Sequence, residues 1–148
     1  MDKRACSSRM ADFNALWKEQ NEIYRSAAKH FGLSESALWI LYSLCEGGGC
    51  RTQRDICSSM IRPKQTTNSA IKQMEKRGLI TMSDGEDRRV RTVRLTPSGQ
   101  RLEQQTAELV IKAENRSMES LTESEQEQLI MLLSKLNSTL KKEMGDLI

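Results

Sequence analysis

The side chains best suited to acid–base, thiol or metal chemistry are few here, namely one histidine and four cysteines: His30, Cys6, Cys45, Cys50 and Cys57. The last three cysteines are separated by four and six residues, unlike the CxxC pairs of zinc sites, and no histidine accompanies them. A lone histidine provides no Ser/His/Asp or Cys/His set for nucleophilic catalysis. Gly47–Gly49 lacks the following Lys and Ser or Thr of a phosphate loop. We therefore expect no enzyme activity, no catalytic residues, no metal and no cofactor.

A second group of residues is suited to hydrogen bonding and to charge contacts. When residues 62–77 are placed at about 100° per residue, they separate into two helix faces. The inward face comprises Thr67, Ala70, Ile71 and Met74, and the outward face comprises Arg62, Gln65, Ser69, Lys72 and Lys76. Gln65 can form paired hydrogen bonds to a base edge in the major groove of DNA, and Thr66 and Ser69 can donate or accept. Lys64, Lys72 and Lys76 are charges suited to phosphates.

The charge distribution favours a polyanion as the partner of this segment. The formal net charge of the chain is only +3. Residues 62–94 contain 9 Lys or Arg and 4 Asp or Glu, whereas residues 1–61 contain 8 and 7, and residues 95–148 contain 6 and 9. A basic segment between a nearly neutral start and an acidic end is the electrostatic pattern expected of a nucleic-acid binder.

The elements that position this face are predicted from spacing. Apolar residues at intervals of three and four predict a long first helix that ends near Gly32. Ser34 is a good N-cap for a second, largely apolar helix that stops at Gly47–Gly49. Thr52 with Asp55 resembles a capping box and begins a short helix. A helix over 63–77, ended by Gly78, follows almost at once, which is a helix-turn-helix pattern.

A short hairpin follows the second of these helices. Residues 79–82 and 90–95 are predicted as strands, and SDGEDRR between them is a turn-forming tip. A hairpin in this position is the wing of a winged-helix domain. Its arginines, Arg88, Arg89 and Arg91, could enter a narrow minor groove, and Asp87 could hold one guanidinium in a fixed orientation.

The rest of the sequence predicts long helices. One runs from about Ser98 to Ser120, and Thr122 with Glu125 forms a second capping box. A leucine stripe then continues to the C-terminus, formed by Leu129, Leu132, Leu133, Leu136, Leu140 and Met144. Because the chain offers this stripe no partner of similar size, we expect the terminal helices to form a dimerisation layer.

Length and composition are typical of a small helical protein that buries additional surface by forming a dimer. The chain has 148 residues, of which 37% are hydrophobic, 4% aromatic and 29% charged. No stretch approaches the roughly 18 apolar residues needed to span a bilayer, and MDKRACSSRM lacks the apolar core of a signal peptide. We expect a cytoplasmic protein with reduced cysteines and no membrane partner.

From Gly32 to about Gly99 the sequence resembles the winged-helix core of MarR-family transcriptional regulators. The resemblance is carried by TQRDI at 52–56, PKQTTNSAI at 63–71, MEKRGLI at 74–80, DRR at 87–89 and VRLTPSG at 93–99. Any one of these motifs is weak, but their order and spacing make the set specific. Flanking helices of suitable length extend the resemblance across nearly the whole chain.

The resemblance implies a mainly α fold with a small β-hairpin wing (α+β), in which the winged helix-turn-helix is flanked by dimerisation helices. It implies one domain over 1–148, with a DNA-binding core at 33–99 and dimerisation helices at 9–31 and 100–148. It further implies a homodimer on an inverted-repeat operator of double-stranded DNA, with the 63–77 helix in the major groove and the 84–90 hairpin in the minor groove. The DNA-binding residues are then Lys64, Gln65, Thr66, Ser69, Lys72, Arg88, Arg89 and Arg91.

The family resemblance also implies a pocket for a small effector between the dimer layer and the winged helix. Its candidate residues are aromatic side chains of the first two helices: Trp17, Tyr24, Trp39 and Tyr42. The function expected is thus that of a ligand-responsive repressor, and the sequence does not name the ligand.

Two alternatives remain open from the residues. One is a thiol-based redox regulator, for which Cys50 is the strongest candidate because it follows three glycines near a helix start, which could lower its pKa. The other belongs to a different class: a helical protein-interaction module that uses the C-terminal leucine stripe and does not bind DNA.

Overall fold

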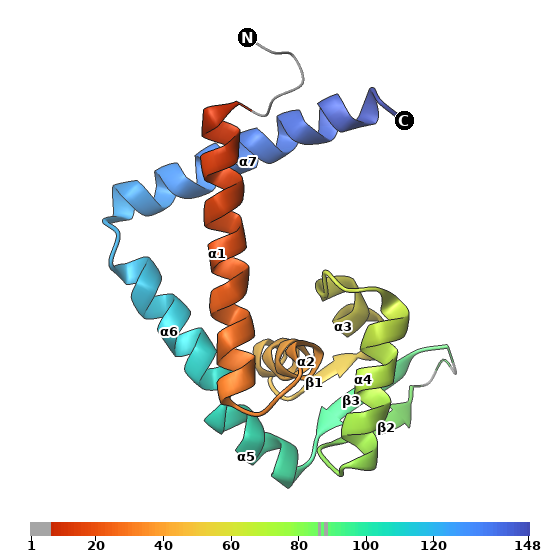
Figure 1. Ribbon diagram of the computed structural model, residues 1–148. Coiled ribbons are helices and arrows are strands. Elements are labelled where there is room, and N and C mark those ends of the chain that lie inside the picture. Colours follow the sequence, from red (N-terminus) through yellow and green to blue (C-terminus); the bar gives the residue numbers. More distant parts are fainter. Residues whose placement is uncertain (1–6, 86, 88) are drawn as a thin grey trace. The chain divides into compact units, whose positions relative to one another are not determined.

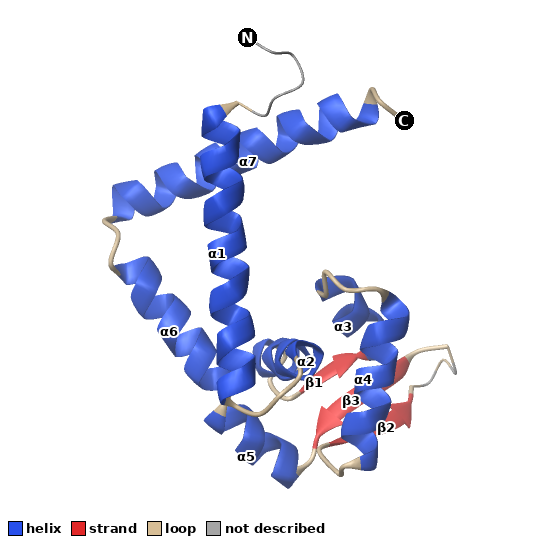
Figure 2. Ribbon diagram, in the orientation of Figure 1, coloured by secondary structure: helices blue, strands red, loops and turns tan. Residues whose placement is uncertain are grey.

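The computed structural model describes residues 7–85, 87 and 89–148 and divides the chain into two compact units, one up to Val110 and one from Ile111 to Ile148. The fold is mainly helical with one small antiparallel sheet, as the sequence predicts, and it has the winged helix-turn-helix arrangement (Figure 2). Arg88 lies outside the described residues.

The first unit is built around α2 (Glu35–Glu46), which is apolar over most of its surface. It contacts α1 (Ser8–His30), α3 (Gln53–Ser59), α4 (Lys64–Lys76) and α5 (Pro97–Gln105) (Figure 1). Ser34 caps α2 by accepting from the Ala37 amide at 3.1 Å, as predicted. Four large α2 side chains are fully buried: Leu38, Ile40, Leu41 and Leu44. The predicted central helix is therefore confirmed as the core of the unit.

The sheet consists of β1 (Cys50–Thr52), β2 (Ile80–Asp84) and β3 (Arg91–Leu95) in the order β1-β3-β2. The predicted hairpin is confirmed as β2 and β3, whose register pairs Ile80 with Leu95 and Asp84 with Arg91. β1 was not predicted from the sequence. Three residues show no periodicity, and the partner of β1 lies about forty residues further along the chain.

The predicted helix from Ser98 to Ser120 is wrong as a single element. The structure has α5, then a break at Thr106, then α6 (Ala107–Glu119). Thr106 has φ −135° and ψ −84°, and its buried hydroxyl donates to the Leu102 carbonyl at 2.6 Å. Such an internal side-chain bond competes with the backbone bonds that would continue the helix.

The junction between wing and α5 packs tightly on the end of α4. Gly78 follows the C-cap with φ +72°, a conformation that favours glycine, and the Leu79 amide bonds the Met74 carbonyl at 3.0 Å. The Thr96 hydroxyl donates to the Gly78 carbonyl at 2.6 Å and accepts from the Gly99 amide at 3.1 Å. Gly99 is buried here against the Leu79 backbone. This contact gives the TPSG motif a structural role.

Gly99→Ala is expected to lower the free energy of unfolding by about 1–3 kcal/mol, because overpacking forces the backbone to move. The added Cβ would collide with the Leu79 carbonyl oxygen. Urea denaturation followed by circular dichroism measures the effect, with Gly145→Ala as the control because a Cβ there meets no atom within 4 Å. Equal midpoints for wild type and Gly99→Ala would contradict the tight junction.

The second unit contains most of α6 and all of α7 (Glu123–Gly145). Thr122 accepts from the Glu125 amide at 3.2 Å, and the Glu125 carboxylate accepts from the Thr122 amide at 2.8 Å. The predicted capping box is therefore confirmed. All residues of α7 are described and none is buried, so its leucine stripe is exposed in the single chain.

The described residues contain neither a membrane-spanning helix nor a metal-binding cluster. No helix among them has the length and apolarity required to cross a membrane. No cluster of three or more His, Cys, Asp or Glu side chains among them could hold a metal ion.

Candidate nucleic-acid interface

The outward face of α4 is exposed along its length. The inward face buries Thr67, Ile71 and Met74, as the helical spacing predicts. All five α4 residues predicted to contact DNA are exposed: Lys64, Gln65, Thr66, Ser69 and Lys72. In the free protein the Ser69 hydroxyl donates to the Gln65 carbonyl at 3.0 Å. Its oxygen can still accept a hydrogen bond, whereas donation to a base would require this bond to break.

Asn68 attaches α4 to α3, a role that the sequence analysis missed. Its side-chain oxygen accepts from Gln53 Nε2 at 2.8 Å and from Cys57 Sγ at 3.3 Å. Both donors lie on α3, so one amide oxygen joins the two helices of the helix-turn-helix. Asn68 lies beside the inward face, where a polar residue can be half-buried, but spacing alone does not identify its partners.

Arg62 does not lie on the outward face of the helix as predicted. The helix begins at Lys64 with Pro63 as its N-cap, so Arg62 belongs to the preceding turn. Its guanidinium forms an ion pair with Glu35 of α2. Arg62 was assigned to the outward face because its position matches the polar spacing of the helix by chance.

The wing is a tight hairpin with exposed basic residues. The Gly85 amide donates to the Val90 carbonyl at 2.8 Å, directly beyond the ends of β2 and β3. Arg89 is exposed, and its backbone amide donates to the Asp87 carboxylate at 3.1 Å. Arg91 pairs through Nε with Asp84 at 3.4 Å across the two strands. Both partners are substantially exposed, so water and salt screen this pair, and a phosphate can compete for Arg91.

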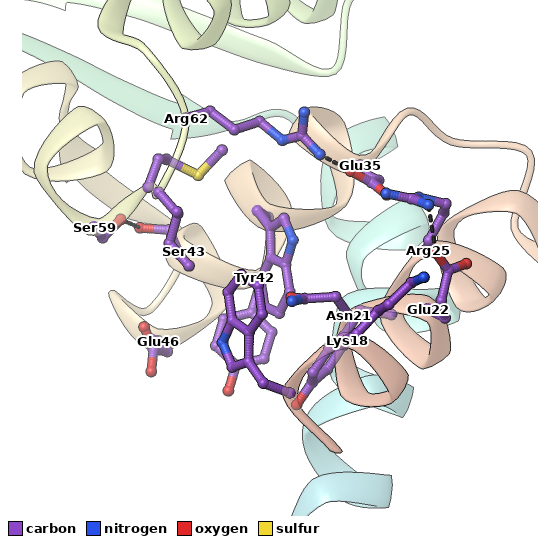
Figure 3. A pocket seen from close by; sticks show the side chains of 15 residues that line it. Lys18, Asn21, Glu22, Arg25, Glu35, Tyr42, Ser43, Glu46, Ser59 and Arg62 are labelled. Carbon is purple, nitrogen blue, oxygen red and sulfur yellow. Dashed lines mark hydrogen bonds and ion pairs between the residues drawn. The ribbon is translucent and has the colours of Figure 1, made fainter. Parts of the chain in front are cut away.

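A pocket of about 640 Å³ lies between α1, α2 and the turn that joins α3 to α4 (Figure 3). All four predicted effector residues line it: Trp17, Tyr24, Trp39 and Tyr42. The Trp39 ring lies 4.9 Å from that of Tyr24 and 5.2 Å from that of Tyr42, measured between centroids. Tilted aromatic rings at these distances attract one another and form a stable apolar wall.

Charged side chains lie along one side of this pocket. Arg25 donates to Glu22 at 2.6 Å and to Glu35 at 2.9 Å, and Glu35 also pairs with Arg62 (Figure 3). The pocket therefore combines aromatic surface with fixed charges. Such a mixture suits a small, partly aromatic molecule.

Part of the chain, including the helix-turn-helix, matches a known protein family. The model of the MarR family matches residues 31–90, which include α2, the helix-turn-helix and the start of the wing. Over these residues the chain is similar to the MarR family. Comparison of the whole sequence with curated proteins finds no significant match.

Solved structures share the fold across most of the chain. A MarR family regulator from Neisseria meningitidis is 22% identical with a TM-score of 0.81, and the match covers 95% of this chain and 99% of that one. MepR from S. aureus, solved as a DNA complex, is 24% identical with a TM-score of 0.69 and coverages of 90% and 98%. BpsR from Bordetella bronchiseptica, whose DNA binding is regulated by 6-hydroxynicotinic acid, is 20% identical with a TM-score of 0.62 and coverages of 85% and 98%.

The three described cysteines of this chain are half-buried thiols. Burial, reinforced by a hydrogen bond with Glu103, raises the pKa of Cys45 to about 12. Burial also raises the pKa of Cys57, although Lys64 partly opposes the shift. Both groups are therefore protonated at neutral pH, which disfavours them as reactive thiols. Cys50 begins β1, three residues before the first residue of α3, and a redox role for it stays a prediction.

Proposed function

We propose that this protein is a homodimeric transcriptional repressor that binds double-stranded DNA and releases it when a small effector occupies the aromatic pocket. The observation that carries the proposal is α4, whose buried face is fixed to the core and whose exposed face presents Gln65, Ser69 and Lys72. A helix held in this way can enter a major groove without rearrangement. Such a regulator acts where the DNA is, so we place it in the cytoplasm.

Within this proposal the contacts divide by chemistry. Gln65, Thr66 and Ser69 read base edges, because they can donate and accept hydrogen bonds. Lys64 and Lys72 contact phosphates, which hold the register without reading sequence. The wing enters the minor groove through Arg88, Arg89 and Arg91, whose charge a narrow groove attracts.

The homodimer is supported by the exposed apolar face of α7. Leu133, Leu136 and Leu140 are 39%, 37% and 40% exposed in the single chain. Burial of apolar area of this kind in an interface stabilises the dimer by about 25 cal/mol per Å². A two-fold dimer would bury it and present two copies of α4 to half-sites about one helical turn apart, which favours an inverted-repeat operator.

The effector site is supported by the pocket and by the behaviour of a structural relative. BpsR responds to 6-hydroxynicotinic acid, a small aromatic acid. The pocket here offers Trp39 and Tyr24 for contact with a ring and Arg25 or Arg62 for an acidic group. An effector acts by differential binding, so it must favour a dimer whose α4 helices no longer fit the half-sites.

The test begins with selection of duplexes from a random-sequence library by the full-length protein. We expect one inverted-repeat sequence to be enriched and bound far more tightly than random duplex. A panel of small aromatic compounds, including 6-hydroxynicotinic acid, is then screened for release of that duplex. Trp39→Leu should still bind DNA but resist release, whereas Phe13→Leu, whose ring lies outside the pocket lining, should respond as wild type does. Failure to enrich any sequence would contradict the proposal.

A further inference from the structure

Glu35, the first residue of α2, makes two ion pairs beside the pocket. One carboxylate oxygen accepts from Arg25 Nε of α1 at 2.9 Å. The other pairs with the guanidinium of Arg62, in the turn before α4. Figure 3 shows Glu35 between these two arginines. A single side chain thus joins α1, α2 and the entry to α4.

Glu35 is better shielded from solvent than its partners. Its side chain is 24% exposed, compared with 60% for Arg25 and 39% for Arg62. A half-buried carboxylate with both oxygens bonded to guanidinium groups is held more firmly than an exposed pair. The two ion pairs therefore hold the guanidinium groups of Arg25 and Arg62 in defined positions.

Arg62 has a particular relation to the start of α4. It directly precedes Pro63, the N-cap, which forms no side-chain cap bond. The ion pair between Arg62 and Glu35 thus attaches this turn to α2. The attachment lies close to the first residues of α4, Lys64 and Gln65. The attachment through Asn68 lies one turn further along the helix. If Arg62 were released, the end of α4 that carries Gln65 would lose a direct link to α2.

Glu35, Arg25 and Arg62 also line the aromatic pocket. A molecule in that pocket therefore lies against the groups that hold the start of α4. Any contact that draws Arg62 or Arg25 away from Glu35 therefore changes how the start of α4 is attached. Because the pocket and this attachment share the same side chains, the effect does not depend on movements of core residues.

We propose that Glu35 is a positioning residue: through Arg62 it holds the N-terminal end of α4 where Gln65 can reach a base, and it links pocket occupancy to that position. This inference rests on the proposed function, since it assumes that α4 reads DNA. A carboxylate repels phosphate, so any effect of Glu35 on DNA affinity is expected to act through Arg62.

The test compares three variants of the full-length protein on the selected duplex and on random duplex. Glu35→Gln keeps the length of the side chain but removes its charge. Glu35→Asp keeps the charge at the start of α2 but is too short to reach both arginines. Glu22→Gln is the matched control, because it makes the same charge change in the same cluster at a residue that pairs with Arg25 and not with Arg62.

Glu35→Gln and Glu35→Asp should each lower the ratio of specific to random affinity roughly 3- to 30-fold, the range typical of residues that couple sites. Glu22→Gln should leave this ratio unchanged. In the double variant Glu35→Gln/Arg62→Gln the ratio should fall no further than in Arg62→Gln alone, because Glu35 acts through Arg62.

A purely structural role would lower the urea midpoint of the Glu35 variants and leave their specificity ratio unchanged, which would overturn the inference. Wild-type behaviour of Glu35→Asp would also overturn it, because the negative charge at the helix start would then be sufficient. If wild type itself binds no duplex selectively, the proposed function has failed. If wild type binds selectively and the Glu35 variants do so equally well, only the positioning role has failed.

Discussion

Gln65→Ala is expected to weaken binding to the selected duplex by about 1–3 kcal/mol, roughly 10- to 100-fold, and to leave binding to random duplex almost unchanged. The side chain is exposed in the first turn of α4, on the side of the helix away from the buried Thr67. Loss of a base contact removes discrimination, because random DNA offers no fixed base to contact. Fluorescence anisotropy with the two duplexes measures both affinities.

Two further variants serve as comparisons for Gln65→Ala. Gln104→Ala changes an exposed glutamine of α5 and should change neither affinity. Arg89→Ala on the wing should weaken binding to both duplexes and lower the slope of log affinity against log salt by about one for each half-site bound. Equal losses by Gln65→Ala on specific and random DNA would show that α4 does not read the sequence. That result would contradict the docking without affecting the fold.

The double variant Leu133→Glu/Leu136→Glu in α7 is expected to convert the dimer into a monomer and to abolish operator binding at micromolar concentration. Burying a leucine contributes about 1.5–3 kcal/mol, and a symmetric dimer changes four leucines at once. A loss of even about 5 kcal/mol raises the dimer dissociation constant by more than three orders of magnitude. Sedimentation velocity measures the oligomeric state.

The control for this variant adds the same charges elsewhere on the same helix. Ser134→Glu/Ser138→Glu places two glutamates away from the leucine stripe and should remain a dimer. If the leucine variant also remained a dimer, the interface would lie elsewhere. A monomeric wild type would exclude the homodimer outright.

The positions of most elements could be predicted from the sequence because the determining interactions are local. Ser34 caps α2, Gly78 ends α4, and Thr122 with Glu125 begins α7, each through bonds that span only a few residues. The inward and outward faces of α4 follow from a period of 3.6 residues and from the burial of Ile71 and Met74. The order of these short-range signals was also sufficient to indicate the family.

The errors in these predictions arise where a distant contact overrides a local pattern. β1 exists because residues 50–52 pair with residues 92–94. The predicted long helix breaks at Thr106, where a buried hydroxyl bonds the backbone of the preceding turn. Arg62 matched the polar spacing of a helix but pairs with a carboxylate 27 residues earlier in the chain.

The sequence by itself thus determined the winged helix-turn-helix and the exposed face of α4, since each depends on residue type and short spacing. The aromatic residues of the pocket were indicated by the family resemblance. Tertiary structure alone decided how these parts are attached. Asn68 joins α4 to α3, Gly99 packs on the backbone of Leu79, and Glu35 joins Arg25 to Arg62. Each attachment depends on which groups folding brings within a few ångströms of one another, and neither periodicity nor composition encodes a pairing between particular side chains.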